Sequence, residues 1–185
     1  MLRAWSAVQG ETSHTISSPV NLRNRLTEPV GMALGLMIWP DVKVTLSYTP
    51  ETSFWEQARQ FQSQLKPQTS TLRLTLPLAI GQRIIDRYPL EQAISVFSQQ
   101  EKPSAHTLSI SNPGRLALNI DYGPLRLVGF FGPLLDANAE EVVLGVATTN
   151  GTLTCTLTFR DLILDPANAA QIRDAALAQL NEVLA

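Results

Sequence analysis

The segment that most restricts the fold is EVVLGVATTNGTLTCTLTFRD, residues 141–161. At its centre lie Asn150 and Gly151, a dipeptide preferred in type I′ turns because both central residues of that turn need a positive φ. After the turn, apolar residues alternate with threonines, and the apolar set is Leu153, Cys155, Leu157 and Phe159. This alternation predicts a β-hairpin with one buried face, and it places Cys155 in the core.

The first half of the chain predicts a helix, an extended segment and a second helix. Residues 2–8 have helical spacing but no room for a cap, so we expect the end of a longer helix. Residues 31–48 form a long extended segment, of which Val42, Val44 and Leu46 form a buried face. Ser53 and Glu56 then form a capping box. We expect Pro67 to end this helix, whose apolar face is Phe54, Ala58, Phe61 and Leu65.

The second half predicts helices, then strands, then a closing helix. Residues 70–100 favour two helical pieces, interrupted at Pro77 and Gly81, and a third piece from Leu90 to Gln100. Three β-like stretches follow: HTLSIS, RLALNI and LRLVGFFGPLL. Asp165 and Pro166 begin the last helix, whose apolar stripe is Ile172, Ala176, Leu180 and Leu184. We therefore expect an α+β fold with a mixed, largely antiparallel sheet packed with helices.

Composition limits the classes of protein that this chain can represent. Its 185 residues suit a single domain spanning residues 1–185, and 44% of them are hydrophobic while only 16% are charged. The low charged fraction suggests a surface that a partner covers. The net charge of −2 comes with no basic stripe, so a nucleic-acid partner is not expected. One cysteine, no signal-peptide pattern and no membrane-length apolar run favour a cytoplasmic protein without a membrane span.

The residues offer no local catalytic or metal-binding motif. His14 and His106 are the only histidines, and neither has a carboxylate at the spacing of a local motif. No cluster of metal ligands, Walker loop, dinucleotide-binding turn or nucleophile elbow occurs. We therefore predict no catalytic residue and no metal. A buried Cys155 would also be a poor nucleophile, because burial in apolar surroundings raises a thiol pKa.

The stretch SISNPGRLAL, residues 109–118, allows two interpretations. Pro113 favours an extended Asn112, and Pro-Gly fits the centre of a type II turn, so Asn112 would end one strand and Arg115 begin the next. In the simpler interpretation the Asn112 side chain only stabilises this turn. In the other, a strand end presents the Asn112 amide to a ligand.

The order of several short motifs resembles the C-terminal half of the chloramphenicol-acetyltransferase-like superfamily. The motifs are SPVNLRNRL, GMALGLMIWPDVKVTL, FWEQARQFQSQL, SISNPGRLAL and LGVATTNGTLTCTLTFRD, followed by a terminal helix. The similarity is greatest to polyketide-associated acyltransferases of the phthiocerol dimycocerosyl transferase type and to condensation domains of nonribosomal peptide synthetases. It covers nearly the whole chain.

This resemblance implies half of a two-lobed enzyme. In such enzymes an acyl thioester and an alcohol or amine enter a tunnel between two halves, and the base belongs to a His-His-x-x-x-Asp motif of the N-terminal half. This chain lacks that motif, so the resemblance implies a subdomain that is inactive alone. It needs no cofactor of its own, since acyl-CoA or a phosphopantetheinyl carrier is the donor substrate. The implied tunnel-wall residues are Asn112, Ser111 and Arg23, and residues 35–46 would span to the other half.

The sequence leaves the partner and two other functions open. The implied partner is an N-terminal acyltransferase half or a second copy of the chain, with an acyl carrier protein as a further candidate. A non-catalytic module that keeps the fold and forms a homodimer is an alternative. A third hypothesis is an unrelated stand-alone enzyme that uses His106 near Asp121 or Arg115.

Overall fold

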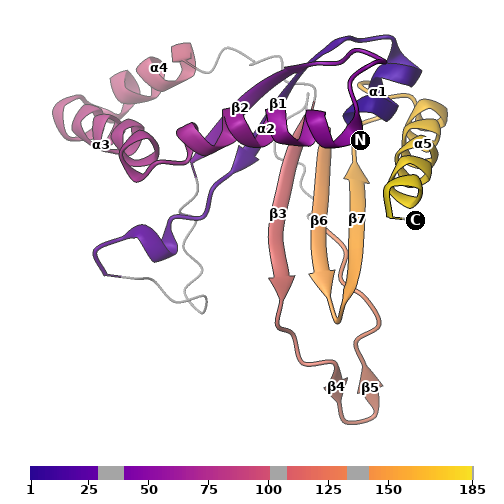
Figure 1. The fold of residues 1–185 in the computed structure, drawn as a ribbon. Coiled ribbons are helices and arrows are strands. Elements are labelled where there is room, and N and C mark those ends of the chain that lie inside the picture. The colour runs from indigo at the N-terminus through magenta and orange to yellow at the C-terminus, as the bar shows by residue number, and fades with distance from the viewer. Residues whose placement is uncertain (29–39, 101–107, 133–141, 185) are drawn as a thin grey trace.

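A five-stranded sheet forms the centre of the molecule (Figure 1), in the strand order β2-β1-β3-β6-β7. The computed structural model describes residues 1–28, 40–100, 108–132 and 142–184. The sheet strands are β1 (Ser13–Pro19), β2 (Asp41–Ser47), β3 (Leu108–Leu116), β6 (Val143–Thr149) and β7 (Thr152–Thr158). The helices are α1 (Leu2–Gln9), η1 (Arg23–Arg25, a 3-10 turn), α2 (Phe54–Gln68), α3 (Thr71–Arg87), α4 (Leu90–Gln100) and α5 (Pro166–Leu184). None of the helices in these described ranges has the length and apolar character that a membrane crossing requires.

The sheet is mixed, which confirms the α+β prediction. β1 pairs antiparallel with β2, and β6 with β7, whereas β3 runs parallel to both of its neighbours, β1 and β6. The two antiparallel pairs are in register over seven residues each, whereas the parallel pair of β1 and β3 spans two, so the sheet is largely antiparallel as predicted. Parallel neighbours need a long crossover: β2, α2, α3 and α4 lie between β1 and β3, and residues 117–142 lie between β3 and β6.

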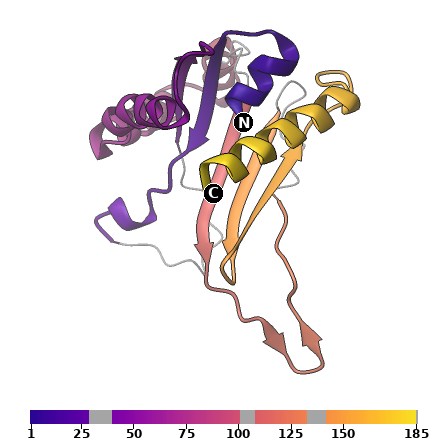
Figure 2. The same cartoon turned by 45° about the vertical axis from the view of Figure 1, so that its right-hand side comes forward.

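The β6–β7 hairpin has the predicted turn, but its predicted face is buried only at one end. Asn150 and Gly151 have φ values of 50° and 77°, as a type I′ turn requires. Leu157 packs against the core, whereas Leu153 is 57% exposed and Cys155 is exposed. Figure 2 shows why: α5 crosses the upper part of these strands, and the hairpin continues below it. The prediction that Cys155 is a core residue is wrong.

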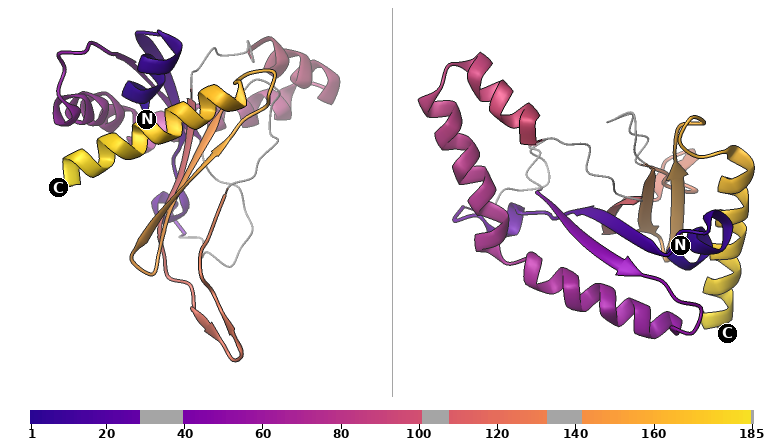
Figure 3. Two further views of the ribbon diagram at one scale, coloured as in Figure 1. Left: turned by 90° about the vertical axis from the view of Figure 1, so that its right-hand side faces the viewer. Right: turned by 90° about the horizontal axis from the view of Figure 1, so that it is seen from above.

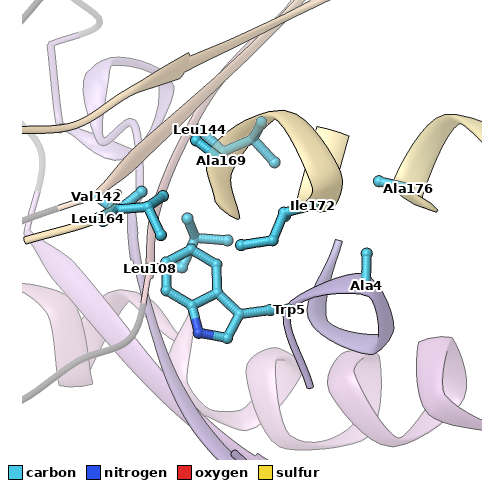
Figure 4. Close-up of a cluster of buried hydrophobic side chains, with 9 residues drawn as sticks. All are labelled: Ala4, Trp5, Leu108, Val142, Leu144, Leu164, Ala169, Ile172 and Ala176. Carbon is cyan, nitrogen blue, oxygen red and sulfur yellow. The ribbon is translucent and has the colours of Figure 1, made fainter. Parts of the chain in front are cut away.

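The main core lies between the sheet and the two terminal helices (Figure 4). Trp5 of α1 and Ile172 of α5 meet Leu108 of β3 and Leu144 of β6. Leu108 and Ile172 are fully buried, so this cluster removes the whole of both side chains from water. The predicted terminal helices are thus confirmed, and α5 uses Ile172 and Ala176 of its expected stripe, although Leu184 is 81% exposed.

Helix α2 covers β1 and β2 from the same side of the sheet. The Ser53 hydroxyl accepts a hydrogen bond from the backbone N–H of Glu56, as the capping box predicts. The helix passes through Pro67 and ends at Gln68, and Gln57 rather than Ala58 lies on its buried face. The predicted end of α2 and its predicted buried face are thus each wrong by one or two residues. Packing against the sheet decides which residues of the helix are buried, and the spacing of apolar residues alone does not. The side chains that pack on the sheet are Phe61 and Leu65, against Ile16, Val44 and Leu46.

Helices α3 and α4 extend away from the sheet beyond α2 (Figure 3, right). The predicted break at Pro77 and Gly81 is absent, since α3 is one helix over both residues. Proline removes one backbone donor but holds φ near its helical value, so a helix can continue through it. Only Leu74 of α3 is buried, in a small cluster with Leu22 and Val42. The predicted bounds of α4 are confirmed.

Candidate functional site

The face of the sheet opposite the helices consists mainly of small and hydroxyl-bearing residues. Residues paired in register share a face, and Ile16, Leu108 and Leu144 point toward the helices. Their neighbours in sequence therefore point to the other side, which we call the hydroxyl face. It comprises Thr15, Ser17, Asp41, Lys43, Thr45, Ser109, Ser111, Val143, Gly145, Ala147, Thr149, Thr154, Thr156 and Thr158, so the edge strand β2 adds one acidic and one basic residue.

Where β3, β6 and β7 lie side by side, the hydroxyl face has small side chains and no charged residue. Ser111 lies opposite Gly145, and Gly145 lies opposite Thr156, so one row across three strands bears two hydroxyls around a glycine. Ser17 and Ala147 are buried, whereas Ser111 and Thr156 are half-buried. Hydroxyl groups donate and accept hydrogen bonds but keep their protons near neutral pH. The Thr156 hydroxyl accepts a hydrogen bond from the backbone N–H of Gly132 at 3.2 Å, so the chain that follows β5 lies against this end of the row. The row itself supplies no general acid or base.

Strand β3 carries a bulge where the sequence predicted a turn. Ser111 pairs with Gly145 and Gly114 pairs with Ala147, so β3 has one residue more than β6 between these two pairs. Gly114 takes a φ of 79°, and its N–H donates to Oδ1 of Asn112 at 2.9 Å. Asn112 therefore does not end a strand, and the prediction of two strands joined by a type II turn is wrong. The side chain stabilises the local chain path, as the simpler interpretation expected.

Two of the three predicted site residues lie together at this bulge. Ser111 is half-buried on the hydroxyl face, and Asn112 is exposed beside it, with no hydrogen bond to its NH₂ group from the described residues. Arg23 lies on η1, a separate element that follows the buried Leu22. Ser111 and Asn112 are adjacent in the sequence, so their proximity is trivial. Arg23 lies on a different element, between β1 and β2 in the sequence. Of the predicted spanning segment, residues 41–46 belong to β2 within the sheet, and residues 35–39 lie outside the described ranges.

After β3 the chain forms an arm, residues 117–131, that extends beyond the end of the sheet (Figure 1). It holds the two-residue strands β4 (Asp121–Tyr122) and β5 (Leu125–Arg126), where the sequence predicted long strands. Two such strands are too few to be stable alone in water. Large apolar side chains nevertheless point into solvent along the arm: Tyr122 is 55% exposed, Leu125 70%, Val128 96% and Phe131 71%. The prediction of long strands is wrong here, because among the described residues the two short strands of the arm pair only with each other.

His14 lies on the helix side of β1, away from the hydroxyl face. Its Nε2 is 2.6 Å from the hydroxyl of Ser6, and its Nδ1 is 3.8 Å from a carboxylate oxygen of Glu11. This order of groups is that of a serine hydrolase, but 3.8 Å is too long for a hydrogen bond and His14 is fully buried. No substrate can reach it, so we assign His14 a structural role that joins α1 to β1. His106 lies outside the described ranges.

The burial of His14 predicts a loss of stability in mild acid. Burial lowers its pKa, and the Glu11 carboxylate and backbone raise it by less. The pKa of histidine in the unfolded chain is about 6.5. Above this pH a histidine with a lowered pKa in the folded state does not change the stability. Below it, the unfolded chain binds the proton more readily, so the fold loses stability as the pH falls. We expect the free energy of unfolding, measured in urea, to fall by up to about 1.4 kcal/mol per pH unit in this window.

Two histidine variants assign this pH dependence to its residue. His14→Gln should make the slope below pH ~6.5 clearly smaller, because glutamine does not titrate there, while the Met1 amino group, whose pKa is also lowered by burial, keeps its own contribution. His106→Gln removes the other histidine of the chain and should leave the slope in place. A slope of the same size in His14→Gln as in the original chain would contradict the assignment.

Among the described residues, the Cys155 thiol and the amino group of Met1 also have shifted pKa values. Burial raises the pKa of the Cys155 thiol, although the residue as a whole is exposed, and the Met1 amino group opposes that shift. Burial lowers the pKa of the Met1 amino group. Cys155 is therefore a weak nucleophile despite its exposure. The described ranges contain no group of His, Cys, Asp and Glu side chains suited to a metal ion.

Solved structures match this fold, although no family model and no curated protein does. The starter condensation domain of rhizomide synthetase RzmA is 15% identical with a TM-score of 0.57, and the match covers 98% of this chain and 38% of that one. The epimerization domain from the third module of tyrocidine synthetase B is 13% identical with a TM-score of 0.58, covering 97% and 39%. A structure described as the basis for condensation domain-mediated chain release from the enacyloxin polyketide synthase is 16% identical with a TM-score of 0.54, covering 97% and 33%. The chain thus has the fold of one part of a condensation-type domain, and it spans less than two fifths of the length of these structures.

Proposed function

We propose that this chain, with the fold of part of a condensation-type domain, is the C-terminal subdomain of an acyltransferase. The complete enzyme would transfer an acyl group from a CoA or carrier-protein thioester to an alcohol or amine. The chain would supply one wall of the substrate tunnel, and an N-terminal half would supply the other. The polyketide-associated type and a cytoplasmic location remain part of this proposal.

The observation that supports it most is the asymmetry of the sheet. One face is covered by α1, α2 and α5, while the other carries small and hydroxyl-bearing side chains without charge where β3, β6 and β7 lie side by side. An acyl thioester on a carrier is an extended chain with amide groups, for which such a face offers hydrogen bonds without bulky side chains. Ser111 and the NH₂ group of Asn112 lie where this face meets the bulge. Their proposed role is to position substrate.

The exposed arm supports the need for a second half. A two-stranded ribbon with several large apolar side chains in solvent is unfavourable in an isolated protein. Burial of one such side chain contributes about 1.5–3 kcal/mol, so a partner that covers the arm would bind through it. We propose that the arm, and not residues 35–46, is the segment that reaches the other half.

The proton chemistry must come from that half. The two histidines of the chain are far apart in sequence, and His14 is buried on the helix side. Loss of a general base costs on the order of two to four decades in rate. The chain alone should therefore show no acyl transfer.

Reconstitution tests the proposal directly. We expect turnover of an acyl-CoA or acyl-carrier substrate when the chain is mixed with a two-histidine N-terminal half encoded beside it, and none with either part alone. The assay follows release of free thiol. Failure to raise the activity of the N-terminal half, with both proteins folded, would count against the function.

The substitution Asn112→Asp tests whether Asn112 positions substrate or only stabilises the bulge in β3. Aspartate keeps the oxygen that accepts from the Gly114 N–H but loses the NH₂ donor. In the reconstituted enzyme we expect a lower kcat/KM with unchanged unfolding, whereas a purely structural Asn112 would leave both unchanged.

A non-catalytic, self-associating module is the second candidate, and the same exposed arm favours it. It predicts a homodimer in which a second copy covers the arm and the hydroxyl face. Light scattering that reports a monomer at all concentrations would exclude this alternative.

A further inference from the structure

Helix α3 carries an apolar stripe that the described part of the chain leaves uncovered. Leu72, Leu76 and Ile80 are spaced four residues apart, so they form one ridge along the helix. Leu72 is 73% exposed, Leu76 52% and Ile80 49%. The ridge lies away from the rest of the molecule, because the buried Leu74 is two residues from both Leu72 and Leu76 and points about 160° from them.

Three arginines share this side of the helix. Arg73 precedes Leu76 by three residues, and Arg83 follows Ile80 by three, which places both beside the ridge. Arg87 follows Arg83 by one further turn. All three are exposed, and no ion pair joins them to a carboxylate within the described ranges. The polar side of α3, in contrast, carries Thr75, Gln82 and Asp86.

The interleaving of arginine and leucine argues for a particular kind of partner. A helix that lies on a membrane keeps its basic residues outside the apolar sector, whereas here they stand among the apolar residues. A symmetric pair of α3 helices would bring like charges together, which is unfavourable. An i, i+4 ridge flanked by cations instead matches an apolar ridge flanked by carboxylates, as in heteromeric helix pairs.

We propose that the ridge of Leu72, Leu76 and Ile80, with Arg73, Arg83 and Arg87, docks an acidic amphipathic helix of another protein or domain. The apolar ridge supplies burial, and the arginines select the partner by charge. This surface is separate from the arm and the hydroxyl face, so the inference does not depend on the proposed function.

A synthetic helical peptide provides the probe. The peptide has leucine at every third or fourth position, flanked by glutamate, and a matched peptide has lysine in place of each glutamate. We expect fluorescence anisotropy to show binding of the glutamate peptide to the whole chain and none of the lysine peptide. High salt should weaken the binding, because exposed charges are screened. A photo-crosslinker at Leu76 should capture the glutamate peptide.

Matched charge reversals locate the binding surface. The double variant Arg73→Glu, Arg83→Glu on α3 should lower the affinity for the glutamate peptide at least about tenfold. Arg59→Glu with Lys66→Glu on α2 makes the same change in net charge away from the ridge and should leave binding unchanged. Circular dichroism confirms that both variants fold. No binding of the glutamate peptide, equal binding of the lysine peptide or equal loss in the α2 variant would overturn the proposal. Binding to anionic phospholipid vesicles alone, or self-association lost in the α3 variant, would also overturn it.

Discussion

Serine at four positions of the arm is expected to weaken binding of the complementary half at least about a thousandfold, without unfolding the chain. The positions are Tyr122, Leu125, Val128 and Phe131, all more than half exposed. A thousandfold change corresponds to about 4.1 kcal/mol, which is the burial of two or three large apolar side chains. Because these side chains already lie in water, their loss should cost the isolated fold little. Titration calorimetry with the two-histidine half measures the effect.

A control with equally exposed apolar residues elsewhere makes this result specific. Leu162 is 94% exposed, Leu184 81% and Leu177 50%, and none of them belongs to the arm. Serine at these three positions should leave the affinity within about twofold of the original. An unchanged affinity in the arm variant would show that the arm is not the contact, even if reconstituted activity is observed.

The largest change in stability is expected for Leu108→Ala. Leu108 is fully buried where β3 meets α1 and α5, so alanine leaves a cavity in the main core. Such substitutions cost about 2–5 kcal/mol, a large share of the ~5–15 kcal/mol that holds a domain folded. Urea unfolding followed by circular dichroism should show a lower midpoint with a similar slope.

Leu125→Ala is the matched control for this substitution. It makes the same chemical change in the arm, at a side chain that is 70% exposed, and should shift the unfolding free energy by no more than about 0.5 kcal/mol. Similar losses for both variants would mean that the arm is packed in solution, which would contradict the arrangement described here.

Features set by neighbouring residues were predictable from the sequence. The Asn150-Gly151 turn, the buried alternation of β2, the Ser53 cap and the bounds of α4 all depend on backbone preference and local spacing. The same holds for the fold class, because the order of helices and strands restricts how layers can pack. The alternation of β7 also placed its threonines on one face, but the hydroxyl face that they form together with β3 and β6 was not predicted.

The tertiary structure decided the rest, because those features depend on what lies across from a residue rather than beside it in sequence. The sequence predicts a turn at Asn112 and Pro113. In the structure β6 pairs with the residues on both sides of them, so they form a bulge within one strand. Cys155 alternates like a core residue, but α5 crosses the hairpin above it. The site itself is set by strand order, since Ser111, Gly145 and Thr156 form one row only when β3, β6 and β7 are neighbours. Spacing along a chain fixes which way a side chain points, whereas burial and contact require the second surface that only the folded chain provides.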